Sequence, residues 1–152
     1  MAFDAKFEAA LSTFDAFNHL MTIQDIRSAL SAVRRALLPG SPFVWDMNLE
    51  DAYQINLERW TATVEDASVG LVRGDYDSAS RTATTELVWF ERSSDNLWRR
   101  HDSRVRERCY ELGEILDAAE AAGFTNVTYR AATAAGMAPD LALGRCFFTA
   151  IV

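Results

Sequence analysis

The stretch from Thr22 to Asn48 constrains the fold more than any other part of the sequence, because it contains a helix and a strand with clear boundaries. Thr22 can cap the first helical turn together with Asp25, and Leu38-Pro39-Gly40 ends the helix. The apolar residues in between recur at helical spacing, as Ile23, Ile26, Leu30, Val33 and Leu37. A short β-prone segment, Phe43–Asn48, follows directly.

A second apolar segment precedes this helix. Phe7–Ser12 is short and carries no helix start signal, so it is predicted to be a buried strand. A strand, a helix and a strand joined by short loops form a βαβ unit, which pairs its strands in parallel through a right-handed crossover. The sequence therefore predicts an α/β protein.

The middle of the chain has a different character, with β-rich segments separated by short polar breaks. The predicted strands are Trp60–Glu65, Val69–Arg73, Thr82–Glu91 and Leu97–Cys109, with breaks at 66–68, 74–80 and 93–96. Breaks this short favour antiparallel hairpins, so residues 59–109 are predicted to form a β-meander. Its last strand is polar on both faces, which indicates that one face borders water or a polar cavity.

The last part of the chain returns to alternating helix and strand. Glu111–Ala122 is predicted to be a helix, and Gly123 ends it. Asn126–Arg130 and Arg145–Ile151 are predicted strands, and residues 131–144 a loop or a short irregular helix. The length of 152 residues suits a single domain.

Composition excludes several classes of partner. The formal net charge of −7 repels phosphate backbones, and the basic stretch Arg99–Arg108 is interleaved with acidic residues, so nucleic acid is not an expected partner. Cys109 and Cys146 have neither CxxC spacing nor a nearby histidine, so no metal is expected. No signal peptide and no apolar run of about 20 residues are present, which predicts a cytoplasmic protein without membrane contact.

Several segments resemble class I S-adenosylmethionine-dependent methyltransferases that act on small molecules. The most specific is Arg35-Ala36-Leu37-Leu38-Pro39-Gly40-Ser41-Pro42-Phe43-Val44-Trp45-Asp46-Met47-Asn48, which is similar to the family's helix end and fifth strand, with Ser41-Pro42 in place of the usual second glycine. The segment FDAKFEAALSTFDAFNHL resembles the fourth strand and its loop, RCYELGEILDAAEAAGF the last helix, and GRCFFTAIV the terminal strand. The resemblance implies a partial Rossmann-like sheet, strands four to seven, with the meander inserted as a lid.

The same resemblance implies that the cofactor-binding half is absent. The family's first strand carries a Gly-x-Gly signature, and its second strand ends in an acid that binds the ribose hydroxyls. The seven glycines of this chain are all isolated. Met1–Asp4 resembles an internal stretch just before the fourth strand, so the expectation is either an internal methionine of a longer reading frame or a genuine half-domain.

The resemblance also implies site residues in the loop after the first strand. Thr13, Phe14 and Asn18 would contact S-adenosylmethionine, and His19 is a weak candidate for a general base, since methyl transfer often needs only positioning. The alternative is loop packing, with Phe14 and Phe17 in the core. Asp46 and Asn48 end the next strand, at the edge where open α/β sheets bind ligands, so they are predicted to bind substrate or else to cap the following turn.

The meander offers a further set of candidates. Tyr76, His101, Arg104 and Arg106 could face a carboxylate or phosphate of the small-molecule acceptor, although solvated strand residues are the simpler interpretation. Three functions therefore stay open: a truncated or partner-dependent methyltransferase, a non-catalytic half-domain used for binding or oligomerisation, and an α+β protein whose meander forms an apolar ligand cup. The first two predict a homodimer or a second chain that supplies the missing half.

Overall fold

A computed structural model describes residues 7–54 and 58–152, and the Met1–Asp4 segment lies outside them. In this part of the chain the strands form two sheets, with orders β1-β2-β8-β7 and β3-β4-β5-β6. The elements of the first sheet and its helices are β1 (Ala10–Ser12), η1 (Ala16–His19), α1 (Ile23–Ala36), β2 (Pro42–Asn48), α2 (Glu50–Tyr53), α3 (Leu112–Ala121), β7 (Thr125–Ala131), η2 (Ala132–Ala135), α4 (Pro139–Ala142) and β8 (Arg145–Ile151).

The predicted βαβ unit is confirmed. β1 pairs with β2 in parallel, with Ala10 opposite Phe43. The side chain of Thr22 accepts a hydrogen bond of 3.1 Å from the amide of Asp25 and so caps α1 as predicted. The first strand is shorter than predicted, because at Phe7 the backbone bonds instead to Ala36 and Leu38 at the end of α1.

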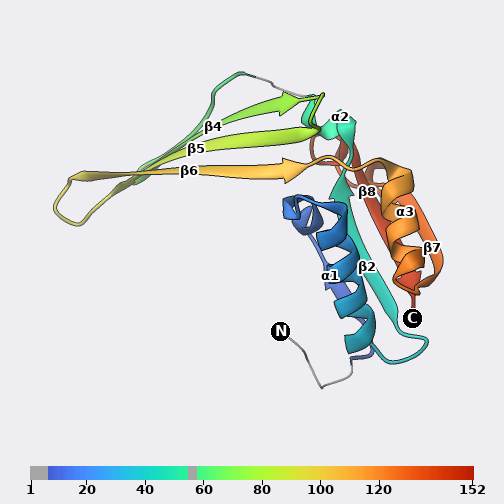
Figure 1. Cartoon of the computed structure of the whole chain (residues 1–152). Helices are drawn as coiled ribbons and strands as arrows, with labels where there is room; N and C mark the ends of the chain where they lie inside the picture. Colours follow the sequence, from blue (N-terminus) through green and yellow to red (C-terminus); the bar gives the residue numbers. More distant parts are fainter. Residues whose placement is uncertain (1–6, 55–57) are drawn as a thin grey trace.

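The core lies between the first sheet and its two long helices. α1 and α3 pack beside each other on one face of the sheet (Figure 1). Phe43, Trp45 and Phe148 point toward the helices and stack, with ring centroids 4.7 and 5.2 Å apart. Ile26 and Ile115 are fully buried against them. The predicted packing of both helices on the sheet is therefore confirmed.

The second sheet is the predicted antiparallel meander, made of β3 (Thr61–Glu65), β4 (Ser68–Asp77), β5 (Thr82–Arg92) and β6 (Trp98–Arg108). It extends as an arm beyond the first sheet, and its base lies near α2 and η1 (Figure 1). β4 runs through Gly74 to Asp77, where a break was predicted, because Gly74 pairs with Thr85 in a continuous hairpin. The final strand β8 is antiparallel to both neighbours, as predicted.

β1 lies at the edge of its sheet within the described residues. Two large apolar side chains on and after this strand face solvent: Leu11 is 72% exposed and Phe14 is 83% exposed. Leu11 is paired with Val44, which is only half-buried, on the sheet face that α1 and α3 leave uncovered. An open edge next to exposed apolar groups is a surface to which another strand can add.

Candidate active site

The polar residues predicted at the strand ends do meet in space. β1 and β2 are parallel, so the loop after Ser12 and the residues Asp46 and Asn48 lie at the same edge of the sheet. The antiparallel strand β8 begins there too, with Arg145 opposite Asn48. Carboxyl ends of parallel strands are where open α/β sheets place their ligands.

A guanidinium joins two carboxylates at this edge. Arg145 donates through one guanidinium nitrogen to Oδ2 of Asp46. Through the other nitrogen it donates to Oδ1 of Asp15, at 3.0 Å. All three side chains are largely buried, with exposed fractions of 17% for Arg145, 3% for Asp46 and 15% for Asp15. The side-chain amide of Asn48 donates to Oδ2 of Asp15 at 2.9 Å. One cation balances two anions, so this cluster keeps an excess negative charge.

Asn18 connects three elements through its side chain. Its amide nitrogen donates to the carbonyl oxygens of Asn48, at 3.0 Å, and Arg108, at 2.9 Å, and its oxygen accepts from the backbone amide of Asn48 at 3.0 Å. The residue is fully buried. Asn18 therefore fixes η1 against the end of β2 and the end of β6, and its proposed cofactor contact would compete with these bonds.

The loop between β1 and η1 has an unusual backbone. Phe14 and Asp15 both adopt positive φ angles, of 58° and 47°. This left-handed region is costly for residues other than glycine, and such strain clusters at functional sites. The conformation turns Phe14 into solvent and Asp15 toward Arg145. Phe17 is buried as the packing alternative required, whereas Phe14 is not.

A second polar cluster lies beside the first. The Nδ1 atom of His19 is 3.4 Å from the carbonyl oxygen of Arg106, and its Nε2 atom is 4.0 Å from Oε1 of Glu107. The phenol of Tyr53 donates to Oε2 of Glu107 at 3.0 Å. Burial raises the pKa of Glu107 and the negative charge of Asp15 raises it further, while the bond from Tyr53 opposes this. Burial and the nearby Glu107 also raise the pKa of Tyr53.

The four candidates on the meander fall on two faces. In the register of the arm, Arg104 is opposite Glu86 and Arg106 is opposite Thr84, on one face. His101 and Glu107 are at odd positions of β6 and so lie on the other face. Tyr76 lies on this face too, because it is opposite Ala83, which is in turn opposite Glu107. Tyr76 stacks on Tyr53 with centroids 5.6 Å apart, which places it near the sheet-edge cluster. The four residues cannot form one site.

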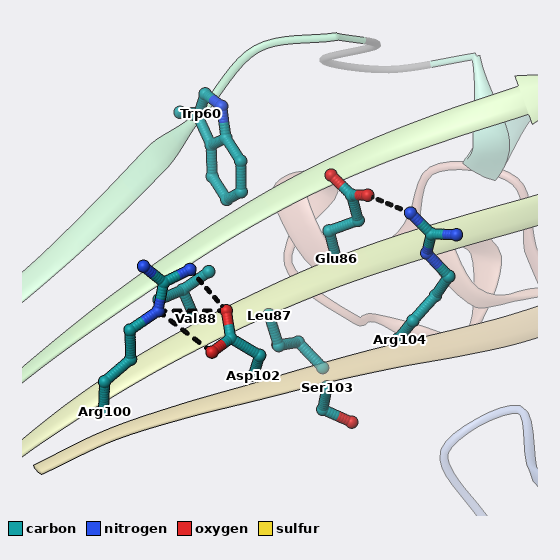
Figure 2. Close-up of a pocket in the computed structure, with 8 residues that line it drawn as sticks. All are labelled: Trp60, Glu86, Leu87, Val88, Arg100, Asp102, Ser103 and Arg104. Carbon is teal, nitrogen blue, oxygen red and sulfur yellow. Dashed lines mark hydrogen bonds and ion pairs between the residues drawn. The ribbon is translucent and has the colours of Figure 1, made fainter.

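The face that carries Arg104 holds an open groove of about 430 Å³ (Figure 2). Figure 2 shows its charged side chains paired with one another: Arg104 with Glu86 at 2.5 Å, and Arg100 with Asp102 at 2.6 Å. Trp60 lies across the groove from these pairs. Because its arginines already have carboxylate partners, this groove offers an anion less than an unpaired arginine would.

Four residues of these clusters were not predicted as site residues: Asp15, Tyr53, Glu107 and Arg145. Arg145 is separated by 130 positions from Asp15 and by 99 from Asp46, so local spacing carries no signal of the contact. Glu107 looked like one member of a mixed-charge strand. The available signal was its position near the end of that strand, two residues before the apolar pair Cys109-Tyr110.

The fold is that of part of an S-adenosylmethionine-dependent methyltransferase. Such an enzyme from Clostridium acetobutylicum superposes with a TM-score of 0.80 at 15% identity, over 100% of this chain and 61% of that one. DesVI from Streptomyces venezuelae gives 0.79 at 17% identity, over 99% and 61%. The sugar N-methyltransferase KedS8 from Streptoalloteichus gives 0.78 at 14% identity, over 99% and 58%. The chain thus spans about three-fifths of these proteins.

The other comparisons gave no match, either to a protein-family model or to a curated protein. Among the described residues no helix is long and apolar enough to cross a membrane. In the same part of the chain no group of three or more histidine, cysteine or acidic side chains is placed to hold a metal ion.

Two described residues stand where a ligand at this sheet edge could touch them. Thr13 and the exposed ring of Phe14 stand at the carboxyl end of β1 and are free to touch a ligand. The sequence contains no Gly-x-Gly loop, whose backbone could approach S-adenosylmethionine closely.

Proposed function

We propose that this chain is the acceptor-binding part of a small-molecule methyltransferase that uses S-adenosylmethionine, equivalent to strands four to seven of the family sheet. The observation that carries the proposal is the match of essentially the whole chain to an S-adenosylmethionine-dependent methyltransferase and to the sugar N-methyltransferase KedS8. The charged cluster of Asp15, Asp46 and Arg145 lies at the strand ends where this fold class binds ligands. The meander would then be the lid over the acceptor.

An amine is the acceptor that this proposal favours. Asp15 and Asp46 share a single guanidinium, that of Arg145, and Glu107 lies near Asp15, so the site repels anions and attracts cations. The printed name of KedS8, a sugar N-methyltransferase, describes an acceptor of this kind. A methyl-transfer assay with labelled S-adenosylmethionine and amino sugars, on the longest reading frame that contains this chain, tests the proposal. Absence of transfer to any amine would contradict it.

We expect the 152-residue chain by itself to bind S-adenosylhomocysteine weakly, with a dissociation constant of about 1 mM or higher. The reason is that Thr13 and Phe14 supply only one wall of the site and no glycine-rich loop is present in the sequence. Calorimetric titration measures this directly. Tight 1:1 binding would show that this chain alone completes the cofactor site.

The open edge of β1 supports the expectation that another strand pairs with it. We propose that strands carrying the cofactor loop pair with Ala10–Ser12, either from the same longer protein or from a separate chain. Two copies of this chain could also pair there across a two-fold axis. Both arrangements would cover Leu11 and Phe14, which are exposed in the single chain.

Leu11→Lys should therefore suppress self-association of the isolated chain, because a charge on an edge strand opposes strand addition. Sedimentation equilibrium at micromolar concentration is the measurement. Val64→Lys is the matched control: Val64 is 71% exposed, against 72% for Leu11, but lies on the meander. A wild-type chain that stays a 17.0 kDa monomer, with β1 amides protected from exchange, would remove the reason to expect a partner.

A non-catalytic half-domain is the second candidate. It is favoured by the absence of a Gly-x-Gly sequence from these residues. Under this alternative the sheet-edge cluster only stabilises the fold, and no arrangement of the chain with a partner would transfer a methyl group. An in-frame acidic-x-Gly-x-Gly-x-Gly sequence upstream in the DNA would decide for the enzyme.

A further inference from the structure

His19 and Glu107 face each other with two hydrogen-bond acceptors. The Nδ1 atom of His19 lies 3.4 Å from the carbonyl oxygen of Arg106, which can only accept, so the neutral tautomer that satisfies this contact has its proton on Nδ1. Nε2 is then an acceptor, and it faces Oε1 of Glu107 at 4.0 Å. The other carboxylate oxygen already takes the phenol hydrogen of Tyr53. With the ring neutral and Glu107 ionised, both Nε2 and Oε1 are acceptors and neither donates to the other.

One small donor that carries two hydrogens can reach both acceptors from beside them. Because the two acceptors are only 4.0 Å apart, a nitrogen about 2.9 Å from each would lie to the side of the line that joins them, with normal hydrogen-bond lengths. An ammonium or amine supplies both hydrogens from a single atom, whereas a hydroxyl supplies only one. Nearly half of the His19 side chain, 45%, is exposed, so a ligand can enter from solvent.

The surroundings of these two acceptors favour a cation. The titratable and charged groups that act on Glu107 are Asp15 from the loop after β1, Tyr53 from α2, His19 from η1 and Arg145 from β8. Arg145 is bound to two carboxylates and so offers Glu107 little compensation. Burial and Asp15 raise the pKa of Glu107, which makes it a stronger proton acceptor than an exposed carboxylate.

We propose that His19 and Glu107 hold the amino group of the methyl acceptor through hydrogen bonds to Nε2 and Oε1, and that Glu107 removes its proton. The proposal rests on the proposed function and adds Glu107 to it as a catalytic residue. The bound ammonium gives one proton to the Glu107 carboxylate, which frees the nitrogen lone pair. That pair forms the bond to the methyl carbon of S-adenosylmethionine, and the methyl–sulfur bond breaks with its electrons remaining on sulfur.

Binding of a simple amino sugar to the full chain tests whether His19 and Glu107 hold an amino group, without requiring methyl transfer. Glucosamine is the probe and glucose is its neutral counterpart, with the ring resonances of His19 followed by NMR. We expect glucosamine to shift these resonances in the wild type and glucose to leave them unchanged. Glu107→Gln should weaken glucosamine binding about tenfold or more, because it removes a charge-assisted bond. Glu91→Gln removes an exposed carboxylate from the same meander and should change binding less than about twofold.

A double-mutant cycle distinguishes joint binding of one nitrogen by His19 and Glu107 from a general effect of negative charge. If His19 and Glu107 hold one nitrogen, His19→Gln combined with Glu107→Gln should weaken binding by less than the product of the single effects. Multiplicative effects would overturn the proposal, and so would equal responses to glucose and glucosamine or no response to glucosamine. Methyl transfer by Glu107→Gln at the wild-type rate would overturn the catalytic role of Glu107 and leave the proposed function standing. Amine binding by the wild type without any methyl transfer would contradict the proposed function and leave the binding of the amine by His19 and Glu107 standing.

The pH dependence of stability gives a further readout. The raised pKa of Glu107 keeps it protonated in the folded state over a pH range in which the unfolded chain has it ionised. The stability that the protonated form provides is present below the usual carboxyl pKa and is lost as the pH rises through the folded-state value. Glu107→Gln should therefore unfold like the wild type at acidic pH and be more stable at neutral pH. Equal stability at both would show that Glu107 is not held in this environment.

Discussion

Replacing Arg145 with methionine is expected to lower the free energy of unfolding by about 3–5 kcal/mol, because it leaves two buried carboxylates without their cation. Asp46 and Asp15 are held together at this point, since the amide of Asp15 donates to Oδ2 of Asp46 at 3.2 Å. Methionine fills a similar volume, so the loss reports charge more than packing. Denaturant unfolding measures it.

Two companion variants identify the cause. Arg130→Met removes an exposed arginine from the neighbouring strand β7 and should change stability by no more than about 0.5 kcal/mol. Arg145→Met combined with Asp46→Asn should recover part of the loss, because one of the two unpaired anions is then neutral. A loss in Arg145→Met that equals the loss in Arg130→Met would contradict the buried network. Recovery by the double variant would exclude a simple packing defect.

The elements with local signals were predictable from the sequence. The Thr22 cap, the five apolar positions of α1 and the Leu38-Pro39-Gly40 stop all act within a few residues, and the structure follows them. The meander was predictable because short polar breaks separate its strands. β4 was longer than expected since a glycine breaks a strand only when no partner holds it, and here Gly74 is paired with Thr85.

The site was only partly predictable, because it depends on contacts between distant segments. Asp46 and Asn48 could be placed at a sheet edge from the parallel pairing alone. The partner Arg145 could not, since its position depends on how β8 inserts between β2 and β7. The left-handed backbone has little sequence signal either, because aspartate at position 15 adopts it only occasionally and a bulky residue such as Phe14 is an outlier there. The likeness to methyltransferases was carried by the segment from Arg35 to Asn48 and by the terminal helix and strand.

Gly144→Ala is expected to be the most damaging of the small substitutions, with a loss of about 4 kcal/mol or more. Gly144 has a φ of 68°, and a β-carbon at this position would lie 2.1 Å from the backbone nitrogen of Ala52. Its carbonyl oxygen also accepts a 2.8 Å hydrogen bond from Leu49, so the backbone cannot move away without breaking that contact. Because Arg145 is the next residue, a shift would also disturb the network with Asp15 and Asp46.

Gly136→Ala is the matched control for this effect. Gly136 has a similar φ of 86°, but a β-carbon there meets no atom within 4 Å. It should therefore cost only the backbone strain of an alanine in the left-handed region, about 1–2 kcal/mol. The difference between the two variants, measured by denaturant unfolding, isolates the clash with Ala52. Equal losses would mean that α2 is not packed against the start of β8. The placement of Tyr53 beside Glu107 would then lose its support, because Tyr53 lies on that same short helix.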